Sequence, residues 1–326
     1  MPDARALQEI WYGGRAPGVM LVLLSNVFGA ASSLRRGLYR AGVLRRTEVG
    51  VPVIVVGNIT VGGTGKTPLV IALVEALRER GWKPGVVSRG FGGSATDVTR
   101  VDAQSDPAVV GDEARLIFDA TQAPTMIGRD RVRAAQGLVA LGVDVIVSDD
   151  GLQHYRLQRD VEICVIDGAR RFGNGRLLPA GPLREPLTRL GSFDFRVCNG
   201  DGAEQAETTM RLSGDSAIAL TDPARNLRLT EIPRAHAVAG IGNPARFFDA
   251  LRAAGVDVIE HPFPDHHAFA PSDFDFGDDL PVLMTDKDAV KCRAFASPSW
   301  WRVPVRAILA DGFFDTVDAR LKMSRR

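Results

Sequence analysis

The sequence predicts an α/β fold: a doubly wound, mostly parallel sheet, and a second, smaller α/β domain joined to it by a β-hairpin linker. A continuous β-branched run, VPVIVVGN at 51–58, is typical of a parallel strand that is buried on both faces. Other strand-like runs alternate with helical segments, which indicates βαβ units. These runs lie at 83–90, 143–151, 161–168 and 193–200.

The first helix after this strand is predicted over 68–80. Pro68 is favourable in a first helical turn, and Gly81 follows the last turn, where helices commonly end. The loop before this helix therefore connects the carboxyl end of a buried strand to a helix N-terminus.

The strand pattern changes near residue 201. The segments TTMRLSGDSAIAL and NLRLTEIPR predict an antiparallel hairpin, and a shorter series of strands and helices begins after Pro233. The predicted units are an N-terminal helix with a basic segment (1–46), a large core domain (47–204), a two-stranded linker (205–233) and a smaller α/β domain (234–326).

Composition restricts the class of protein. A chain of 326 residues can form two domains, and 45% apolar with 24% charged residues is ordinary for a globular protein. A net charge of +1 gives no overall attraction to nucleic acid, so none is expected as a partner. Three cysteines, without any C-x-x-C spacing, indicate buried free thiols in a reducing compartment: Cys164, Cys198 and Cys292.

The N-terminal segment combines an apolar stretch with arginines. The stretch 19–31 is too short for a membrane-spanning helix, and it lacks the preceding basic region of a signal peptide. This pattern predicts a helix lying in a membrane interface, with guanidinium groups on anionic headgroups. The alternative is a buried core helix with a solvated basic tail. The arginines concerned are Arg35, Arg36, Arg40, Arg45 and Arg46.

The loop TVGGTGKT at 60–67 has the composition of a phosphate-binding loop, which makes the predicted fold P-loop NTPase-like. Its glycines allow backbone N–H groups to point at phosphate oxygens, and the following helix N-terminus also favours anions. Lys66 would contact the β- and γ-phosphates, and the Thr67 hydroxyl would contact Mg²⁺. Thr60 replaces the usual first glycine, but later residues make the cradle. The predicted phosphate site is Thr60, Val61, Gly62, Gly63, Thr64, Gly65, Lys66 and Thr67.

Two adjacent carboxylates lie at the carboxyl end of the predicted strand over 143–151. Asp149 and Asp150 would lie beside the phosphate loop, where Mg²⁺ is usually held. Their side chains point to opposite faces of an extended chain, so one could reach a metal while the other braces a neighbour. The alternative is a simple Asp-Gly turn. Gln153 and His154 extend the same edge.

The remaining polar clusters are weak signals by themselves. Asp112 and Glu113 begin a predicted helix, where carboxylates are common caps. His266 and His267 follow Asp265 in a predicted loop, and without further ligand spacing a catalytic or hydrogen-bonding role is favoured over zinc.

Two further motifs imitate known nucleotide-binding patterns. GIGNP follows a predicted strand but lacks the third glycine of a dinucleotide turn. TDKD at 285–288 is similar to a base-reading motif of GTPases, but its lysine and aspartate are adjacent, so guanine specificity is not supported.

Taken in order, seven blocks resemble the tetraacyldisaccharide 4'-kinases of lipid A synthesis, over nearly the whole chain. The blocks are VGNITVGGTGKTP, SRGFGG, VGDEA, DDGLQH, LLPAGPLREP, FPDHHAF and TDKDAVK. The resemblance implies transfer of the ATP γ-phosphoryl group to the 4' hydroxyl of a tetraacylated disaccharide 1-phosphate, with Mg²⁺. It also implies a glycolipid substrate, a monomer, and peripheral attachment to an anionic surface at the cytoplasmic face of the bacterial inner membrane.

The same resemblance implies roles for individual residues. Asp112 would be the catalytic base, with His266 as its partner across a domain cleft, although His267 remains an alternative partner. Domain closure would then precede transfer. Lys66 and Thr67 would hold phosphates and Mg²⁺. The metal and nucleotide edge would comprise Asp149, Asp150, Gln153 and His154, joined by Arg184 and Glu185, with Ser88 and Arg89 as candidate substrate or nucleotide contacts.

Two other functions use the same fold. One is a membrane-peripheral NTPase switch or metallochaperone, although the cysteine pairs of a metal carrier are missing from the sequence. The other is a kinase for a soluble sugar or nucleotide, in which the N-terminal helix belongs to the core.

Overall fold

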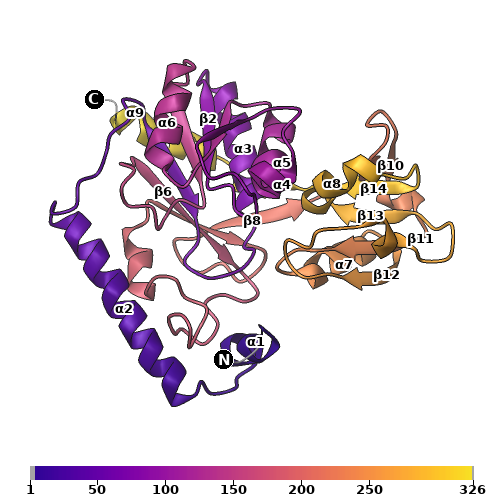
Figure 1. Ribbon diagram of the computed structural model, residues 1–326, viewed down its shortest axis with the longest axis horizontal. Coiled ribbons are helices and arrows are strands. Elements are labelled where there is room, and N and C mark those ends of the chain that lie inside the picture. Colours follow the sequence, from indigo (N-terminus) through magenta and orange to yellow (C-terminus); the bar gives the residue numbers. More distant parts are fainter. Residues whose placement is uncertain (1–3, 325–326) are drawn as a thin grey trace.

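The computed structural model describes residues 4–324, and in this range each of two domains is built around one sheet (Figure 1). The strands of the large domain are, in spatial order, β15 (Arg306–Leu309), β8 (Thr208–Ser213), β7 (Phe195–Asn199), β6 (Val161–Asp167), β1 (Val53–Gly57), β5 (Val145–Asp149), β2 (Pro84–Ser88), β4 (Thr125–Ile127) and β3 (Thr99–Val101). Those of the small domain are β10 (Asn226–Arg228), β9 (Ser216–Ala219), β14 (Trp300–Val303), β13 (Val282–Thr285), β11 (Arg234–Ala239) and β12 (Asp257–Pro262).

The helices connect these strands and cover both sheets. The α-helices are α1 (Ala4–Tyr12), α2 (Val19–Arg40), α3 (Lys66–Glu79), α4 (Pro107–Val110), α5 (Asp112–Thr121), α6 (Arg131–Ala140), α7 (Pro244–Ala253), α8 (Asp286–Cys292) and α9 (Phe313–Ser324). Short 3₁₀ turns are η1 (Leu187–Ser192), η2 (Leu229–Glu231), η3 (Pro271–Phe274) and η4 (Arg293–Phe295).

The large sheet is doubly wound, as predicted. Strand β1 lies between β5 and β6 and runs parallel to both. Its side chains alternate between two cores: Val53 and Val55 pack with α6, whereas Ile54 and Val56 pack with α3 and α9. Because both faces are buried, the strand is apolar at every position. Antiparallel pairs occur at the two edges, β3 with β4 and β8 with β15.

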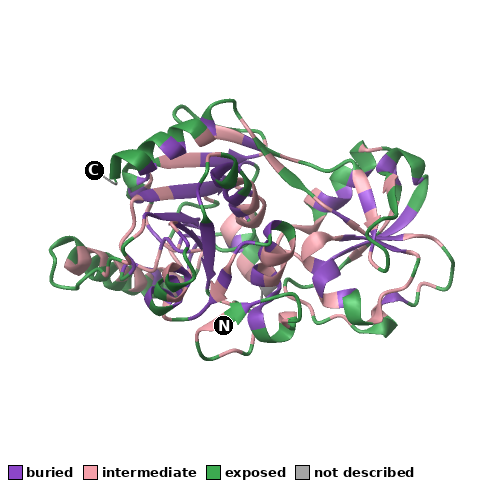
Figure 2. Cartoon of the chain, turned by 90° about the horizontal axis from the view of Figure 1, so that it is seen from above, coloured by how far each residue is buried: buried purple, intermediate pink, exposed green. Residues whose placement is uncertain are grey.

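The small domain is also an α/β unit. Its four strands β12, β11, β13 and β14 are parallel, and β9 and β10 add an antiparallel edge. Helix α7 covers one face, and α8 covers the other, which is rich in aromatic rings such as Phe274 and Trp300. Figure 2 shows buried residues concentrated in the strands of both sheets.

The structure differs from the predicted boundaries at the linker and at the C-terminus. The two segments of the predicted hairpin do pair, because β9 and β10 are antiparallel neighbours, but this hairpin belongs to the small sheet. Strand β8 buries Met210 in the large core, whereas β9 buries Ala217 in the small core, so the linker predicted over 205–233 is divided between the two domains. The antiparallel pair that leads toward the small domain is β8 with β15, which lie about a hundred residues apart in sequence. Strand β15 and helix α9 then return to the large domain. The sequence pattern identified these segments as strands. Their pairing partners, however, depend on the core in which the apolar face of each strand is buried.

Helix α2 lies along the outside of the large domain (Figure 1). It is held there by a hydrogen bond from Ser25 Oγ to the carbonyl of Leu177, at 2.8 Å. Within residues 4–324, none of the helices combines the length and the apolar character that a membrane crossing requires. The apolar residues on the exposed side of α2 are Val19, Met20, Leu23, Leu24, Val27 and Leu34.

Candidate active site

The phosphate loop follows β1 at the carboxyl edge of the sheet, where ligands bind in open α/β sheets. Gly62 and Gly65 have φ of 99° and 89°, in the left-handed region that favours glycine. A Cβ atom at Gly65 would lie 2.3 Å from Nδ2 of Asn199, and that amide donates to the Thr64 carbonyl at 3.0 Å. The loop is therefore held in a fixed shape, and α3 begins directly after it.

Lys66 is positioned by the loop and by Asp150. Its Nζ lies 3.3 Å from Asn58 Oδ1 and 3.7 Å from Asp150 Oδ1. Arg184 donates to both oxygens of Asp150, at 3.0 and 3.1 Å, and to the Thr60 carbonyl at 3.1 Å. Burial acts to raise the pKa of Asp150, but Lys66 and Arg184 outweigh it and hold that pKa far below its usual range. Asp150 thus braces the loop as an ionised carboxylate.

Asp149 is the last residue of β5 and has a different environment. It is 1% exposed, and its Oδ2 accepts a hydrogen bond from Ser88 Oγ at 3.2 Å. Among residues 4–324, its Oδ1 has no hydrogen-bond partner. Burial, followed by the charges of Glu113 and Asp150, raises the pKa of Asp149 to about 7. The two carboxylates thus differ as expected in their partners, but Asp150 lies just beyond the strand with φ of 45°, so the turn after β5 separates them rather than strand alternation.

The donor set beside the loop fits Mg²⁺. A buried carboxylate oxygen without a partner is rare unless it serves a ligand. Mg²⁺ is typically held by one or two carboxylates together with substrate phosphates and waters, rather than by a protein cage. This agrees with the described residues, in which no group of three or more histidine, cysteine or acidic side chains could hold a metal. Asp149 and the Thr67 hydroxyl are the groups that would hold the cation.

The Asp149→Asn variant is expected to be more stable than the wild type in the absence of ligand. Between the ordinary carboxyl pKa and about 7, rising pH ionises Asp149 in the unfolded chain but not in the folded one, so wild-type stability falls. Asparagine removes this cost and keeps an acceptor for Ser88. We expect a gain of about 2–6 °C in Tm at pH 8, and a smaller gain at pH 5. Thermal denaturation in EDTA measures it, and a lower Tm at pH 8 would contradict the assignment.

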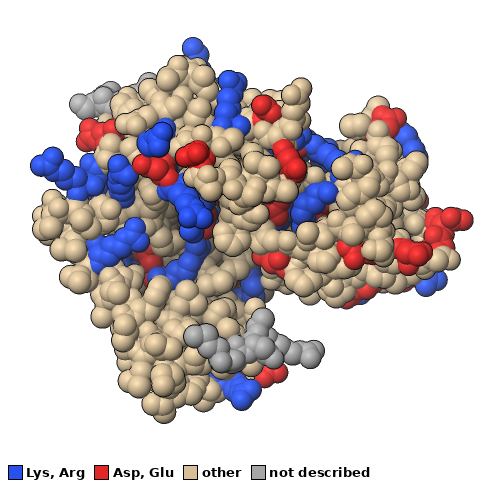
Figure 3. All heavy atoms as spheres, in the orientation of Figure 1, with Lys and Arg blue, Asp and Glu red and all other residues tan. Residues whose placement is uncertain are grey.

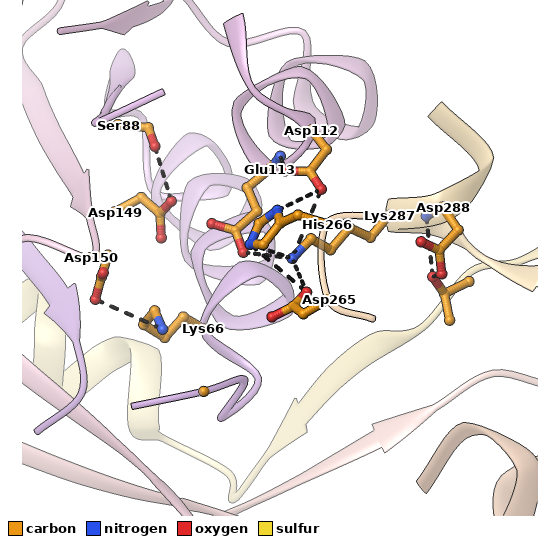
Figure 4. Close-up of polar contacts among 12 residues, drawn as sticks. Lys66, Ser88, Asp112, Glu113, Asp149, Asp150, Asp265, His266, Lys287 and Asp288 are labelled. Carbon is orange, nitrogen blue, oxygen red and sulfur yellow. Dashed lines mark hydrogen bonds and ion pairs between the residues drawn. The ribbon is translucent and has the colours of Figure 1, made fainter. Parts of the chain in front are cut away.

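The second part of the site lies where the small domain meets α5. Asp112, the first residue of α5, is 5% exposed, and its Oδ2 lies 3.1 Å from Nδ1 of His266 (Figure 4). His267 instead contacts Asp273 at 3.0 Å. The structure thus selects His266 as the partner of Asp112. The hydrogen bond that His266 makes to Asp112 raises the pKa of His266. Burial acts to raise the pKa of Asp112, but this hydrogen bond and the charge of Lys287 outweigh it and lower that pKa.

Lys287 joins this pair and was not predicted as a site residue. Its Nζ lies 3.2 Å from Glu113, 3.1 Å from Asp265 and 3.4 Å from Nε2 of His266. Burial would lower the pKa of Lys287, but these carboxylates, with Asp112, raise it well above its usual range. Its neighbour Asp288 has a different role: it accepts from the Gly240 N–H at 2.9 Å and supports the small domain. The sequence signal that could have indicated Lys287 is the charged pair Lys287 and Asp288 at the start of a helix that follows a buried strand.

The other predicted residues lie in several different environments. Gln153 Nε2 donates to the Asn58 carbonyl at 3.2 Å and to Glu185 at 3.1 Å. Glu185 is 1% exposed and pairs with Arg189 at 3.1 Å, so it does not face the loop opening. Burial, with the charges of Arg131 and Arg159, lowers the pKa of His154 to about 4. Arg89 is exposed at the end of β2, next to Ser88.

Comparison with known proteins decides the family. Residues 18–322 match the family model for tetraacyldisaccharide-1-P 4'-kinase. The chain belongs to this family. Two tetraacyldisaccharide 4'-kinases illustrate the similarity: one from Xanthomonas euvesicatoria pv. vesicatoria is 51% identical, covering 95% of this chain and 94% of that one, and one from Stenotrophomonas maltophilia is 50% identical, covering 97% and 96%.

A solved structure agrees with this 4'-kinase assignment. The crystal structure of an "apo" form of LpxK from Aquifex aeolicus, in complex with ATP, superimposes with a TM-score of 0.76 at 26% identity. The match covers 92% of this chain and 96% of that one. The P-loop NTPase-like fold expected for a 4'-kinase is thereby confirmed.

Proposed function

We propose that this kinase transfers the γ-phosphoryl group of ATP to the 4' hydroxyl of tetraacyldisaccharide 1-phosphate, forming lipid IVA, the bisphosphorylated precursor of lipid A in lipopolysaccharide synthesis. The observation that carries the proposal is the pairing of a phosphate loop with the Asp112–His266 pair from two domains. Membership of the 4'-kinase family supplies the reaction class.

In this proposal the chain's own groups have separate roles. Asp112 accepts the proton of the 4' hydroxyl as that oxygen bonds to the γ-phosphorus, and the bond from the γ-phosphorus to the β-phosphate oxygen breaks to release ADP. His266 orients the carboxylate through its 3.1 Å contact. Lys66 and the loop N–H groups hold the phosphates. Asp149 and Thr67 would hold Mg²⁺, which when bound offsets the negative charge of the phosphate oxygens.

Lys287→Met is expected to move the acidic limb of the pH profile of kcat/KM to higher pH. The ammonium of Lys287 lies 3.9 Å from Asp112 Oδ2 and contributes to the lowered pKa of that carboxyl. The base must be ionised to accept a proton, so removing the positive charge raises the pH that the active form requires. Rates measured between pH 4 and 9 test this. Lys322→Met, at a lysine of α9 paired with Asp318, is the control and should leave the limb in place.

The exposed face of α2 supports a lipid-facing role. Its exposed apolar side chains are accompanied by basic residues, and Figure 3 shows a group of basic side chains on the left of the molecule, where α2 ends in Figure 1. A cavity of about 210 Å³ lies between the end of α2 and the core, lined in part by Arg36, Arg40 and Arg46. Apolar residues with arginines suit the interface of an anionic bilayer. Binding of the monomer to the cytoplasmic face of the bacterial inner membrane would bring a glycolipid substrate to the site.

Replacing two apolar residues of α2 is expected to reduce membrane binding. Leu23 and Val27 are 55% and 67% exposed, one turn apart. The double change Leu23→Gln with Val27→Gln should weaken partitioning onto anionic phospholipid vesicles by about 100-fold or more, because each buried apolar side chain contributes about 1.5–3 kcal/mol. Vesicle sedimentation measures it. Ile308→Gln is the control, because Ile308 is 55% exposed on β15. Equal binding of the double variant and the wild type would place the lipid contact elsewhere.

The reaction itself is tested by following labelled γ-phosphate. ATP, Mg²⁺ and purified tetraacyldisaccharide 1-phosphate in detergent micelles should yield a labelled bisphosphorylated lipid. Label released as free phosphate whether or not lipid is present would instead indicate an NTPase switch. Label on a soluble sugar or nucleotide, with none on the lipid, would indicate the soluble kinase.

A further inference from the structure

The small domain also touches the phosphate loop itself, apart from the contact of His266 with Asp112. The segment 240–246, GIGNPAR, joins β11 to α7. A Cβ atom at Gly242 would lie 2.9 Å from the backbone nitrogen of Gly63 and 3.5 Å from its Cα. This contact is between backbones, and Gly63 belongs to the phosphate cradle. The motif that resembled an incomplete dinucleotide turn therefore lies against the loop.

An ion pair fixes the same segment to the large domain. Arg246, in the first turn of α7, donates from Nη2 to Asp167 Oδ1 at 3.0 Å. Asp167 is the last residue of β6 and is 2% exposed. Its other oxygen accepts from Arg170 at 2.9 Å, and the same Arg170 guanidinium donates to the Gly63 carbonyl. A charge-assisted hydrogen bond to a buried carboxylate is stronger than a surface ion pair.

The two domain contacts lie close to each other on one interface. His266 and Lys287 meet Asp112, whereas Gly242 and Arg246 meet the loop, and a Cβ atom at Gly242 would also lie 3.4 Å from Oδ2 of Asp265, which pairs with Lys287. The domains are connected by two neighbouring crossings, after β8 and before β15, where Gly214 packs against the Pro304 carbonyl. A domain on such a connection can rotate unless it is held at two points.

We propose that the segment 240–246 is a latch that holds the small domain on the phosphate loop, and that Arg246 and Gly242 are positioning residues for phosphoryl transfer. The inference rests on the proposed function, because it assigns the latch to the closed state in which Asp112 and His266 meet. Latch and pair act together: when the latch opens, His266 loses its fixed position over Asp112 and water enters the site.

Arg246→Ala is the first test. Asp167 keeps Arg170 and the N–H groups of Ala169 and Arg170, so the local fold survives the change. We expect kcat for lipid phosphorylation to fall about 5- to 20-fold, with a smaller change in KM for ATP, and Arg246→Lys to recover part of the loss. Arg252→Ala is the matched control, because Arg252 lies on the same helix but pairs with Asp249 and Glu260 within the small domain.

Gly242→Ala tests the backbone contact without removing a charge. The backbone of Gly242 lies outside the left-handed region, so alanine is compatible with its conformation, but the added methyl group would meet Gly63. We expect the same loss of kcat as for Arg246→Ala. Gly191→Ala is the control, because a Cβ atom there meets no atom within 4 Å and its φ is also ordinary. Wild-type kcat in both Arg246→Ala and Gly242→Ala would overturn the latch.

A distance measurement separates the latch from the reaction. Spin labels at Glu75→Cys and Ala250→Cys report on the two domains, and the native cysteines are buried and so resist labelling. We expect a broader distance distribution in Arg246→Ala and Gly242→Ala, but not in Arg252→Ala. An unchanged distribution in both variants would overturn the latch. If the wild type failed to phosphorylate the lipid, the proposed function would be wrong, and the distance measurement would still decide whether the latch exists.

Discussion

Asp112→Asn is expected to lower kcat for lipid phosphorylation by about 10²- to 10⁴-fold, the range typical of a lost general base. Asparagine has the same shape, and its oxygen can still accept the Glu113 N–H, which Asp112 Oδ1 accepts at 2.9 Å. What is lost is the negative charge that accepts the proton and pairs with His266. Single-turnover transfer of labelled phosphate measures kcat, and calorimetric binding of ATP should change little.

A matched substitution on the same helix provides the control. Asp119 of α5 pairs with Arg115 at 2.9 Å and with Arg293 of the small domain at 2.6 Å, so Asp119→Asn also removes a charge near the domain interface. We expect its kcat to stay within about threefold of wild type, because rim ion pairs contribute little. If Asp112→Asn were no slower than Asp119→Asn, the catalytic base would have to be another group.

The phosphate side of the site could be predicted from the sequence because its signal is local. A buried strand, a glycine-rich loop and a helix follow one another within 51–80, and this order alone places Lys66 at a helix start. Asp149 and Asp150 were found in the same way, since they end a neighbouring parallel strand. Strand alternation does not account for their different environments, because Asp150 lies just beyond β5 with φ of 45°.

The acceptor side could not be predicted from local patterns. By itself Asp112 is a carboxylate at a helix start, and only the family resemblance marked it as a base. Lys287 and Arg246 act across the domain interface, and their contacts depend on how two rigid bodies meet. That placement depends on β15, which the sequence pattern assigned to the small domain but which pairs with β8 of the large sheet. Long-range pairing leaves no periodic signal in one sequence.

Lys66→Met is expected to reduce phosphoryl transfer about 10³-fold or more. Lys66 is the cation of the loop, its side chain is 13% exposed, and Asp150 and Asn58 fix its ammonium group. Because the group is oriented before ATP binds, its attraction for the γ-phosphate requires no reorganisation during the reaction. Methionine retains the length and apolar part of the side chain and removes only the charge. Labelled phosphate transfer at saturating lipid and Mg²⁺ measures the loss.

The effect on the fold should be small, and this separates chemistry from stability. Without Lys66, Asp150 still has both hydrogen bonds to Arg184, at 3.0 and 3.1 Å, so no buried charge is left unpaired. We therefore expect Tm to change by less than about 4 °C, or roughly 1 kcal/mol. Lys83→Met, at an exposed position before β2, should retain wild-type transfer and wild-type Tm. If Lys66→Met lost activity only in proportion to the fraction of protein that is unfolded, the lysine would support the loop rather than contact the phosphates.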